Sequence, residues 1–188
     1  MSRSSGPGGT RTRADPRAFA VLGGLVFAAG GSDPWQVAAG AGMGAASGWL
    51  AAIDLTSHRL PNRVLLPTSL ALATTIAVQA LAAGDGAAAR GAAAGALAIA
   101  AALLLFALVT RGGLGLGDVK FGALLGMWAG WLALLAPVVV VASAFLTGGV
   151  VALVGMARGT TTPSTRIPFG PMLAVGGAVA TWWVGLAT

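Results

Sequence analysis

Cysteine is absent from the chain, and His58 is the only histidine. Composition therefore excludes disulfide bonds, thiolate nucleophiles and metal cages built from cysteine and histidine. Glutamate is absent as well, so all five acidic side chains are aspartates. We expect no bound metal and no cofactor, which leaves these carboxylates as the main candidates for acid–base chemistry.

Charged residues are also scarce. They make up 9% of the 188 residues, whereas 56% are hydrophobic and the mean hydropathy is +0.86. A soluble domain carries roughly 25% charged residues, so this composition indicates an integral membrane protein whose partner is the lipid bilayer. The alternating pattern of a transmembrane barrel is missing, and the many alanines and glycines suit closely packed helices. We expect an all-α, polytopic bundle of about seven transmembrane helices.

The net charge of +6 comes from basic residues that are scattered through short loops. In a polytopic protein such residues set the orientation across the membrane. No basic or aromatic module typical of nucleic-acid binding accompanies them, so we expect no nucleic-acid partner.

The N-terminal residues 1–17 are polar, and we predict a disordered basic tail on the cytoplasmic side. Residues 18–188 are predicted to form the transmembrane domain. Its first apolar run, residues 18–30, is shorter than the roughly 20 residues that a spanning helix needs. We interpret it as a short or tilted helix. The alternative is the apolar region of a cleaved signal peptide, which would leave six spans.

The remaining spans are read from the apolar runs and the turn residues between them. Residues 119–156 are too long for one helix, so we divide them near Gly130–Trp131, with Pro137 as a competing boundary. The other expected spans are residues 35–53, 64–83, 91–109 and 171–186.

Orientation follows from the positions of the lysines and arginines. With a cytoplasmic N-terminus, ten of the eleven fall on the cytoplasmic side and only Arg90 falls outside. The same assignment places Asp54 and Asp118 at the cytoplasmic face of the cell membrane, at one depth. Loss of the first run would not change this arrangement.

Asp118 lies in Gly113–Lys120, between two long apolar runs, where a charge is costly and indicates a function. Two carboxylates about 3 Å apart cannot both ionise easily, so one keeps its proton. Such a pair can activate a water with one carboxylate and protonate a peptide carbonyl with the other. Nearby glycines would let a substrate backbone approach. From the residues alone, peptide hydrolysis, a structural role at helix ends and proton-coupled transport all stay open.

Three segments resemble the signatures of the prepilin peptidases, the type IV leader peptidase family. Asp54 is followed after six residues by Pro61–Asn62, as in the family's first signature. Gly115–Lys120 resembles the second, the Gly-x-Gly-Asp-x-Lys motif, and Ile167–Pro171 resembles a third, less diagnostic segment. The three occur in the family's order, and the resemblance covers roughly residues 35–186.

This resemblance implies a membrane aspartic endopeptidase that cuts the short basic leader from type IV pilins and pilin-like secretion subunits. It implies cleavage at the cytoplasmic face, after a glycine that precedes the hydrophobic pilin helix. Asp54 and Asp118 match the catalytic pair, and the supporting motif positions are Pro61, Asn62, Gly115, Gly117 and Lys120. For Lys120 we hypothesise a positioning role. The alternatives are a small proton-linked transporter that uses the same two aspartates as a relay, and a structural membrane subunit.

Departures from the family pattern refine this expectation. Larger members have an N-terminal region with paired cysteines, which is associated with methylation of the new pilin N-terminus. This cysteine-free chain resembles the minimal, peptidase-only members often found with tight-adherence (Flp-type) pilus systems, so methyltransferase activity is not expected. The presenilin-related proteases share Gly-x-Gly-Asp, but their first aspartate follows a tyrosine, and this chain has none. We expect His58 to be a solvated loop residue.

Overall fold

The computed structural model describes residues 15–30, 33–57, 60–110, 114–160, 162 and 168–187. These residues form seven helices and no strand, which confirms the predicted all-α fold. The helices are α1 (Pro16–Ala29), α2 (Pro34–Ser57), α3 (Asn62–Ala83), α4 (Ala87–Val109), α5 (Leu116–Leu132), α6 (Ala136–Ala157) and α7 (Gly170–Ala187). Most of the predicted tail, together with His58, lies outside the described residues.

The apolar helices are those of a membrane bundle. Four of them, α3, α4, α6 and α7, are long and apolar enough to cross a membrane. The first helix is short, with 14 residues, as expected from its apolar run. It begins at Pro16. The preceding residue, Asp15, is its N-cap, and the Asp15 side chain accepts a hydrogen bond from the Arg17 amide at 2.9 Å.

Three predicted boundaries were wrong by several residues, and the first is the start of α4, which lies at Ala87 and not at residue 91. The second helix continues past Ile53 to Ser57. Within its last turn, the hydroxyls of Thr56 and Ser57 both donate to the Ile53 carbonyl at 2.9 Å, so these polar residues are accommodated in the helix. Asp54 therefore lies inside this helix. The expected turn near Gly130–Trp131 lies instead at residues 133–135, and Pro137 falls in the first turn of α6, where proline is tolerated.

Small residues bring the helices together in close pairs. Helix α1 packs along α2, α4 along α5, and α6 along α7. A side chain at Gly44 would meet the carbonyl oxygen of Gly23, and one at Gly126 would meet that of Gly95. In the core, the fully buried Trp128 donates from its indole nitrogen to Thr181 Oγ1 at 2.8 Å. The close contacts at the glycines are the kind of packing expected where apolar helices approach through their backbones.

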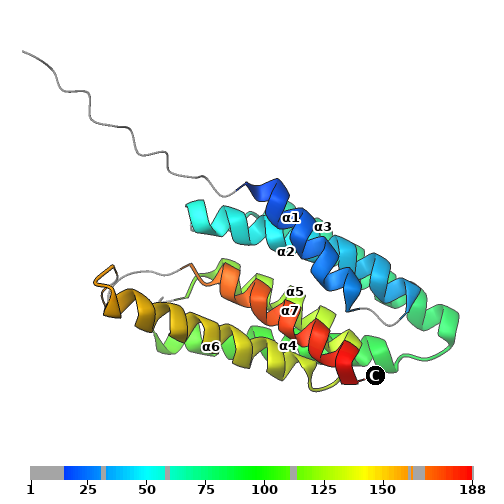
Figure 1. Ribbon diagram of the computed structural model, residues 1–188. Helices are drawn as coiled ribbons and strands as arrows, with labels where there is room; N and C mark the ends of the chain where they lie inside the picture. The colour runs from blue at the N-terminus through cyan, green and yellow to red at the C-terminus, as the bar shows by residue number, and fades with distance from the viewer. Residues whose placement is uncertain are drawn as a thin grey trace, which may run out of the picture.

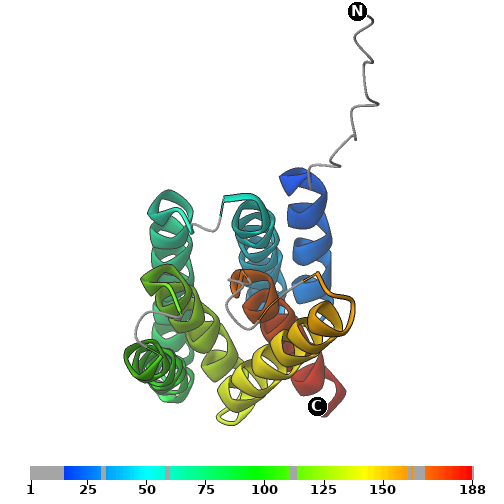
Figure 2. The same ribbon diagram turned by 90° about the vertical axis from the view of Figure 1, so that its left-hand side faces the viewer.

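The helices alternate in direction, so the starts of α1, α3, α5 and α7 share one end of the bundle with the ends of α2, α4 and α6 (Figure 1). Figure 2 looks onto that end, where the start of α7, in orange, lies in the middle of the helices. Of the described basic residues, Arg17, Arg63, Lys120 and Arg158 lie at this end and Arg90 at the other.

Candidate functional site

Asp54 is held in the last turn of α2, with 4% of its surface exposed. The backbone N–H of Gly170, the first residue of α7, donates a hydrogen bond to Asp54 Oδ2 at 2.9 Å. The first amides of a helix have no acceptor within the helix, and they favour a negative charge nearby. A buried carboxylate requires such a partner, so α7 provides part of the environment that keeps Asp54 in the bundle.

Asp118 lies in the first turn of α5, before the apolar part of that helix. Its Oδ2 accepts a hydrogen bond from the amide of Gly115 at 3.2 Å, and its own amide donates to the Gly115 carbonyl at 3.0 Å. Gly115 is the N-cap residue and has no side chain, so the Asp118 carboxylate supplies only the half of a capping box that accepts from the N-cap amide. The other carboxylate oxygen, Oδ1, is buried and accepts no hydrogen bond from the residues that the structure describes.

The second motif glycine, Gly117, has a packing reason. A Cβ atom there would lie 3.2 Å from Leu60 Cβ, closer than side chains normally approach. Gly117 thus lets the first turn of α5 lie against the residue that precedes Pro61. This glycine therefore has a packing role at the junction of the two motifs, and substrate approach along the glycines beside Asp118 stays a prediction.

The two aspartates interact electrostatically although they come from different helices. Burial raises the pKa of Asp118 above its ordinary value, and the nearby charge of Asp54 raises this pKa further. The hydrogen bond from the Gly115 amide acts in the opposite direction and lowers it. The structure therefore brings the two predicted acids into one electrostatic site, in which Asp118 holds its proton more tightly than an exposed aspartate.

The supporting motif residues gather beside this pair. Pro61 is the N-cap of α3, and its carbonyl accepts hydrogen bonds from the amides of Val64 and Leu65. Asn62 follows it, and Asn62 Oδ1 accepts a hydrogen bond from Lys120 Nζ at 3.2 Å. The first and second motifs are thus in direct contact through their polar side chains.

From the sequence, Gly170 was expected only as one residue of the third motif. The sequence feature that marks this segment is the third motif, Ile167–Pro171. Ile167 lies outside the described residues. The ring of Phe169 packs on Phe145 with 5.3 Å between centroids, which anchors the start of α7 to α6. The contribution of this segment to the site is a backbone amide, which no pattern of side chains reveals.

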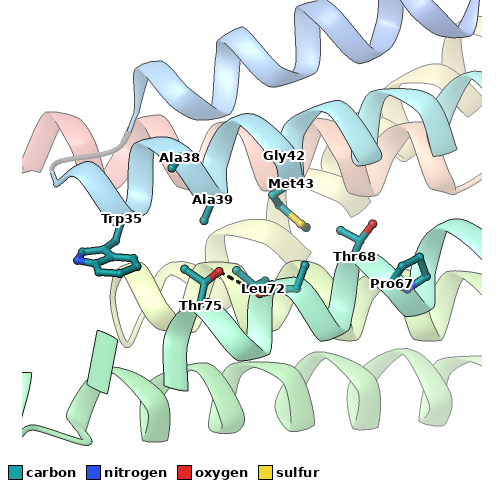
Figure 3. Close-up of a pocket in the computed structure, with 10 residues that line it drawn as sticks. Trp35, Ala38, Ala39, Gly42, Met43, Pro67, Thr68, Leu72 and Thr75 are labelled. Carbon is teal, nitrogen blue, oxygen red and sulfur yellow. Dashed lines mark hydrogen bonds between the residues drawn. The ribbon is translucent and has the colours of Figure 1, made fainter. Parts of the chain in front are cut away.

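A groove of about 520 Å³ lies elsewhere, between α2 and α3, and extends from Trp35 to Pro67 (Figure 3). The hydroxyls of Thr68 and Thr75 on its wall bond to carbonyls of their own helix, so the lining is apolar in character. Neither Asp54 nor Asp118 lines this groove. The acid pair, and not the groove, is the candidate site.

The pair has the parts for acid–base chemistry. Asp54 has an oxygen bonded to a helix-start amide, whereas Asp118 has a buried oxygen without a described partner and a raised pKa. Carboxyls whose proton affinities are driven apart can act as base and acid at the same pH. Within the described part of the chain, no three or more His, Cys, Asp or Glu side chains gather as in a metal site.

Comparison with known proteins agrees with the motifs. A family model described as the type IV leader peptidase family matches residues 42–153, which include both aspartates and end before α7. The prepilin leader peptidase/N-methyltransferase of Pseudomonas aeruginosa is 40% identical over 80 residues, which are 42% of this chain and 27% of that protein. That of Burkholderia pseudomallei (strain K96243) is 48% identical over 66 residues, 35% of this chain and 20% of that protein.

The matched region makes up a larger share of a shorter relative. The leader peptidase HopD of Salmonella typhimurium is 42% identical over 72 residues, which are 38% of this chain and 45% of HopD. The chain thus spans about a quarter of the length of the first relatives and less than half of HopD. No solved structure matches the chain.

Proposed function

Because the chain belongs to the type IV leader peptidase family, we propose that it is a membrane aspartic endopeptidase that removes the basic leader of type IV pilin-like precursors. The observation that carries the proposal is the electrostatic pairing of Asp54 and Asp118, which lie 64 positions apart and on different helices. The relatives named prepilin leader peptidase support a substrate of the prepilin class.

In the proposed mechanism, Asp54 is the ionised base and Asp118 the protonated acid. Asp54 takes a proton from a water molecule whose oxygen attacks the scissile carbonyl carbon, while Asp118 gives its proton to the carbonyl oxygen. When the tetrahedral intermediate collapses, the C–N bond breaks, Asp54 protonates the leaving nitrogen, and Asp118 recovers its proton. The raised pKa of Asp118 and the Gly170 hydrogen bond to Asp54 support this division of roles.

The remaining motif residues are proposed to position the acids. Gly115 caps α5 and bonds Asp118, and Gly117 lets this turn pack on Leu60. Lys120 and Asn62 join the starts of α5 and α3, and Pro61 begins α3 in the conformation that this contact needs. None of these side chains has to touch the scissile bond for the arrangement to work.

We place the site at the cytoplasmic face of the cell membrane. Four of the five described basic residues lie at the end of the bundle that carries the aspartates, as the positive-inside rule requires of a cytoplasmic end. A basic leader is retained on the same side of the membrane by the same rule. Leader and catalytic pair would therefore meet without movement of the leader across the bilayer.

The test is cleavage by the purified protein reconstituted in lipid vesicles. The substrate is a peptide with a basic leader that ends in glycine and is followed by an apolar helix, and mass spectrometry identifies the products. We expect one cut, directly after the glycine, and loss of this cut when the glycine is replaced by valine. An intact substrate after prolonged incubation with folded protein would contradict the proposal. Proton uptake into the vesicles without cleavage would point to transport instead.

A further inference from the structure

The start of α7 contacts the candidate base through a backbone amide. The amide of Gly170 donates to Asp54 Oδ2 at 2.9 Å in a buried environment, although the two residues are 116 positions apart. Helix α7 carries no charged residue, so its only electrostatic contribution to Asp54 comes from the backbone. The family model ends at residue 153, before this helix.

The close approach of Asp54 leaves no room for a side chain at position 170. A Cβ atom there would lie 2.8 Å from Asp54 Oδ2, 3.1 Å from Asp54 Cγ and 3.2 Å from Asp54 Cβ. All three of these nearest atoms belong to the side chain of Asp54. A methyl group would therefore displace the carboxylate without forcing the two helix backbones apart.

Aromatic packing fixes where this amide lies. The ring of Phe169 packs on Phe145 at 5.3 Å, and Phe145 packs edge-on against Phe106 at 5.1 Å. These three rings connect the start of α7 to α6 and to the last turn of α4. In addition, the Leu173 amide donates to the Phe169 carbonyl at 3.0 Å, so the first turn of α7 is already formed at Phe169.

We propose that Gly170 is a positioning residue for the cleavage reaction, which holds the Asp54 carboxylate in its catalytic orientation through the backbone amide. This inference rests on the function proposed above. The hydrogen bond occupies Oδ2 and restricts rotation of the carboxylate, so that the group keeps a fixed orientation toward the reacting water. Gly170 itself touches neither the water nor the substrate; it acts through Asp54.

The test compares Gly170→Ala with Gly149→Ala, where an added Cβ atom meets nothing within 4 Å. Both variants are purified in detergent, and cleavage is measured per mole of folded, monodisperse protein. For Gly170→Ala we expect kcat to fall at least tenfold while KM stays within twofold, because the substrate still binds but the base is displaced. Gly149→Ala should match the wild type in both constants. A wild-type kcat in Gly170→Ala would overturn the proposal.

A second variant decides the question if Gly170→Ala does not fold. Phe145→Ala removes the ring on which Phe169 packs, while Asp54 and Gly170 keep their own atoms. We expect a severalfold loss of kcat with an unchanged KM, and recovery in Phe145→Tyr, which keeps a ring at this position. An unchanged kcat in Phe145→Ala would contradict the inference. Absence of cleavage by the wild type would instead overturn the proposed function, so the two failures are distinguishable.

Discussion

Lys120 Nζ donates a hydrogen bond to Asn62 Oδ1 at 3.2 Å, and this contact joins the first turn of α5 to the first turn of α3. Both residues lie next to other motif residues in the chain. Lys120 follows Asp118 by two positions, and Asn62 directly follows Pro61, the N-cap of α3. An exposed hydrogen bond of this kind stabilises a protein only slightly. Its importance therefore lies in where it holds the start of α5.

Removal of this contact should reduce activity moderately. We expect Lys120→Met and Asn62→Ala each to lower kcat/KM by roughly tenfold, equivalent to about 1.4 kcal/mol. The double variant should be no worse than either single variant, because both remove the same bond. Arg158→Met, at the same end of the bundle, removes a charge outside the site and should have no effect. Losses that multiply in the double variant would contradict a shared contact.

Stability should depend on pH through Asp118. Its raised pKa means that the folded protein binds this proton more tightly than the unfolded chain does. The stabilisation is therefore fully present below the ordinary aspartate pKa, about 4, and is lost as the pH rises through the raised value. Thermal unfolding of the wild type should shift to lower temperature over this range, and cleavage should decline as the acid loses its proton.

Asp118→Asn provides the matched test of that dependence. This variant should flatten the change of unfolding temperature with pH and unfold at a higher temperature than the wild type at pH 7. Asp85→Asn, in the exposed turn between α3 and α4, should retain the wild-type dependence. An unchanged pH dependence in Asp118→Asn would show that another group is responsible.

Glycine packing between α1 and α2 should be sensitive to a single methyl group. In Gly44→Ala the new Cβ atom would meet the carbonyl oxygen of Gly23 and lie 2.8 Å from Phe27 Cβ, so the helices must separate. We expect a loss of about 2 kcal/mol in the free energy of unfolding. Gly42→Ala, on the same helix and with nothing within 4 Å, should be neutral or slightly stabilising. Equal unfolding temperatures for the two variants would contradict this packing.

The buried hydrogen bond from Trp128 to Thr181 should contribute to stability. Thr181→Val removes the acceptor and leaves the indole N–H unpaired in the core, at a cost of about 1–3 kcal/mol. Thr75→Val is the control, since that hydroxyl bonds to the Ala71 carbonyl of its own helix. Thermal unfolding in detergent measures both variants, and a smaller loss in Thr181→Val than in Thr75→Val would be unexpected.

The sequence predicted the helices well because each apolar run is long and is separated from the next by turn residues. It predicted their ends less well. The hydroxyls of Thr56 and Ser57 extend α2 by bonding to Ile53, which places Asp54 within a helix and not in a loop. The boundary between α5 and α6 lies closer to Pro137, the competing position, than to Gly130–Trp131. Hydropathy alone does not report the residue at which such a helix ends or begins.

The polar side chains that gather at the candidate site could be picked out from the sequence. Asp54, Asn62, Asp118 and Lys120 were all found from their motifs, because carboxylates, amides and amines in an apolar chain stand out. The contact of Gly170 with Asp54 was not predictable, because it is made by a backbone amide that tertiary packing brings to the carboxylate. The packing of Gly117 against Leu60 was likewise not predicted, because it depends on tertiary contact.

The most direct test of the two-aspartate mechanism is the cleavage rate of Asp54→Asn, Asp118→Asn and the double variant, measured on folded protein in vesicles. If the carboxyls act as one unit, each single variant should lose between about 100-fold and 10,000-fold in kcat, and the double variant should lose no more. Asp85→Asn, at the opposite end of the bundle, should retain the wild-type rate. Full cleavage by either single variant, or losses that multiply in the double variant, would contradict the account.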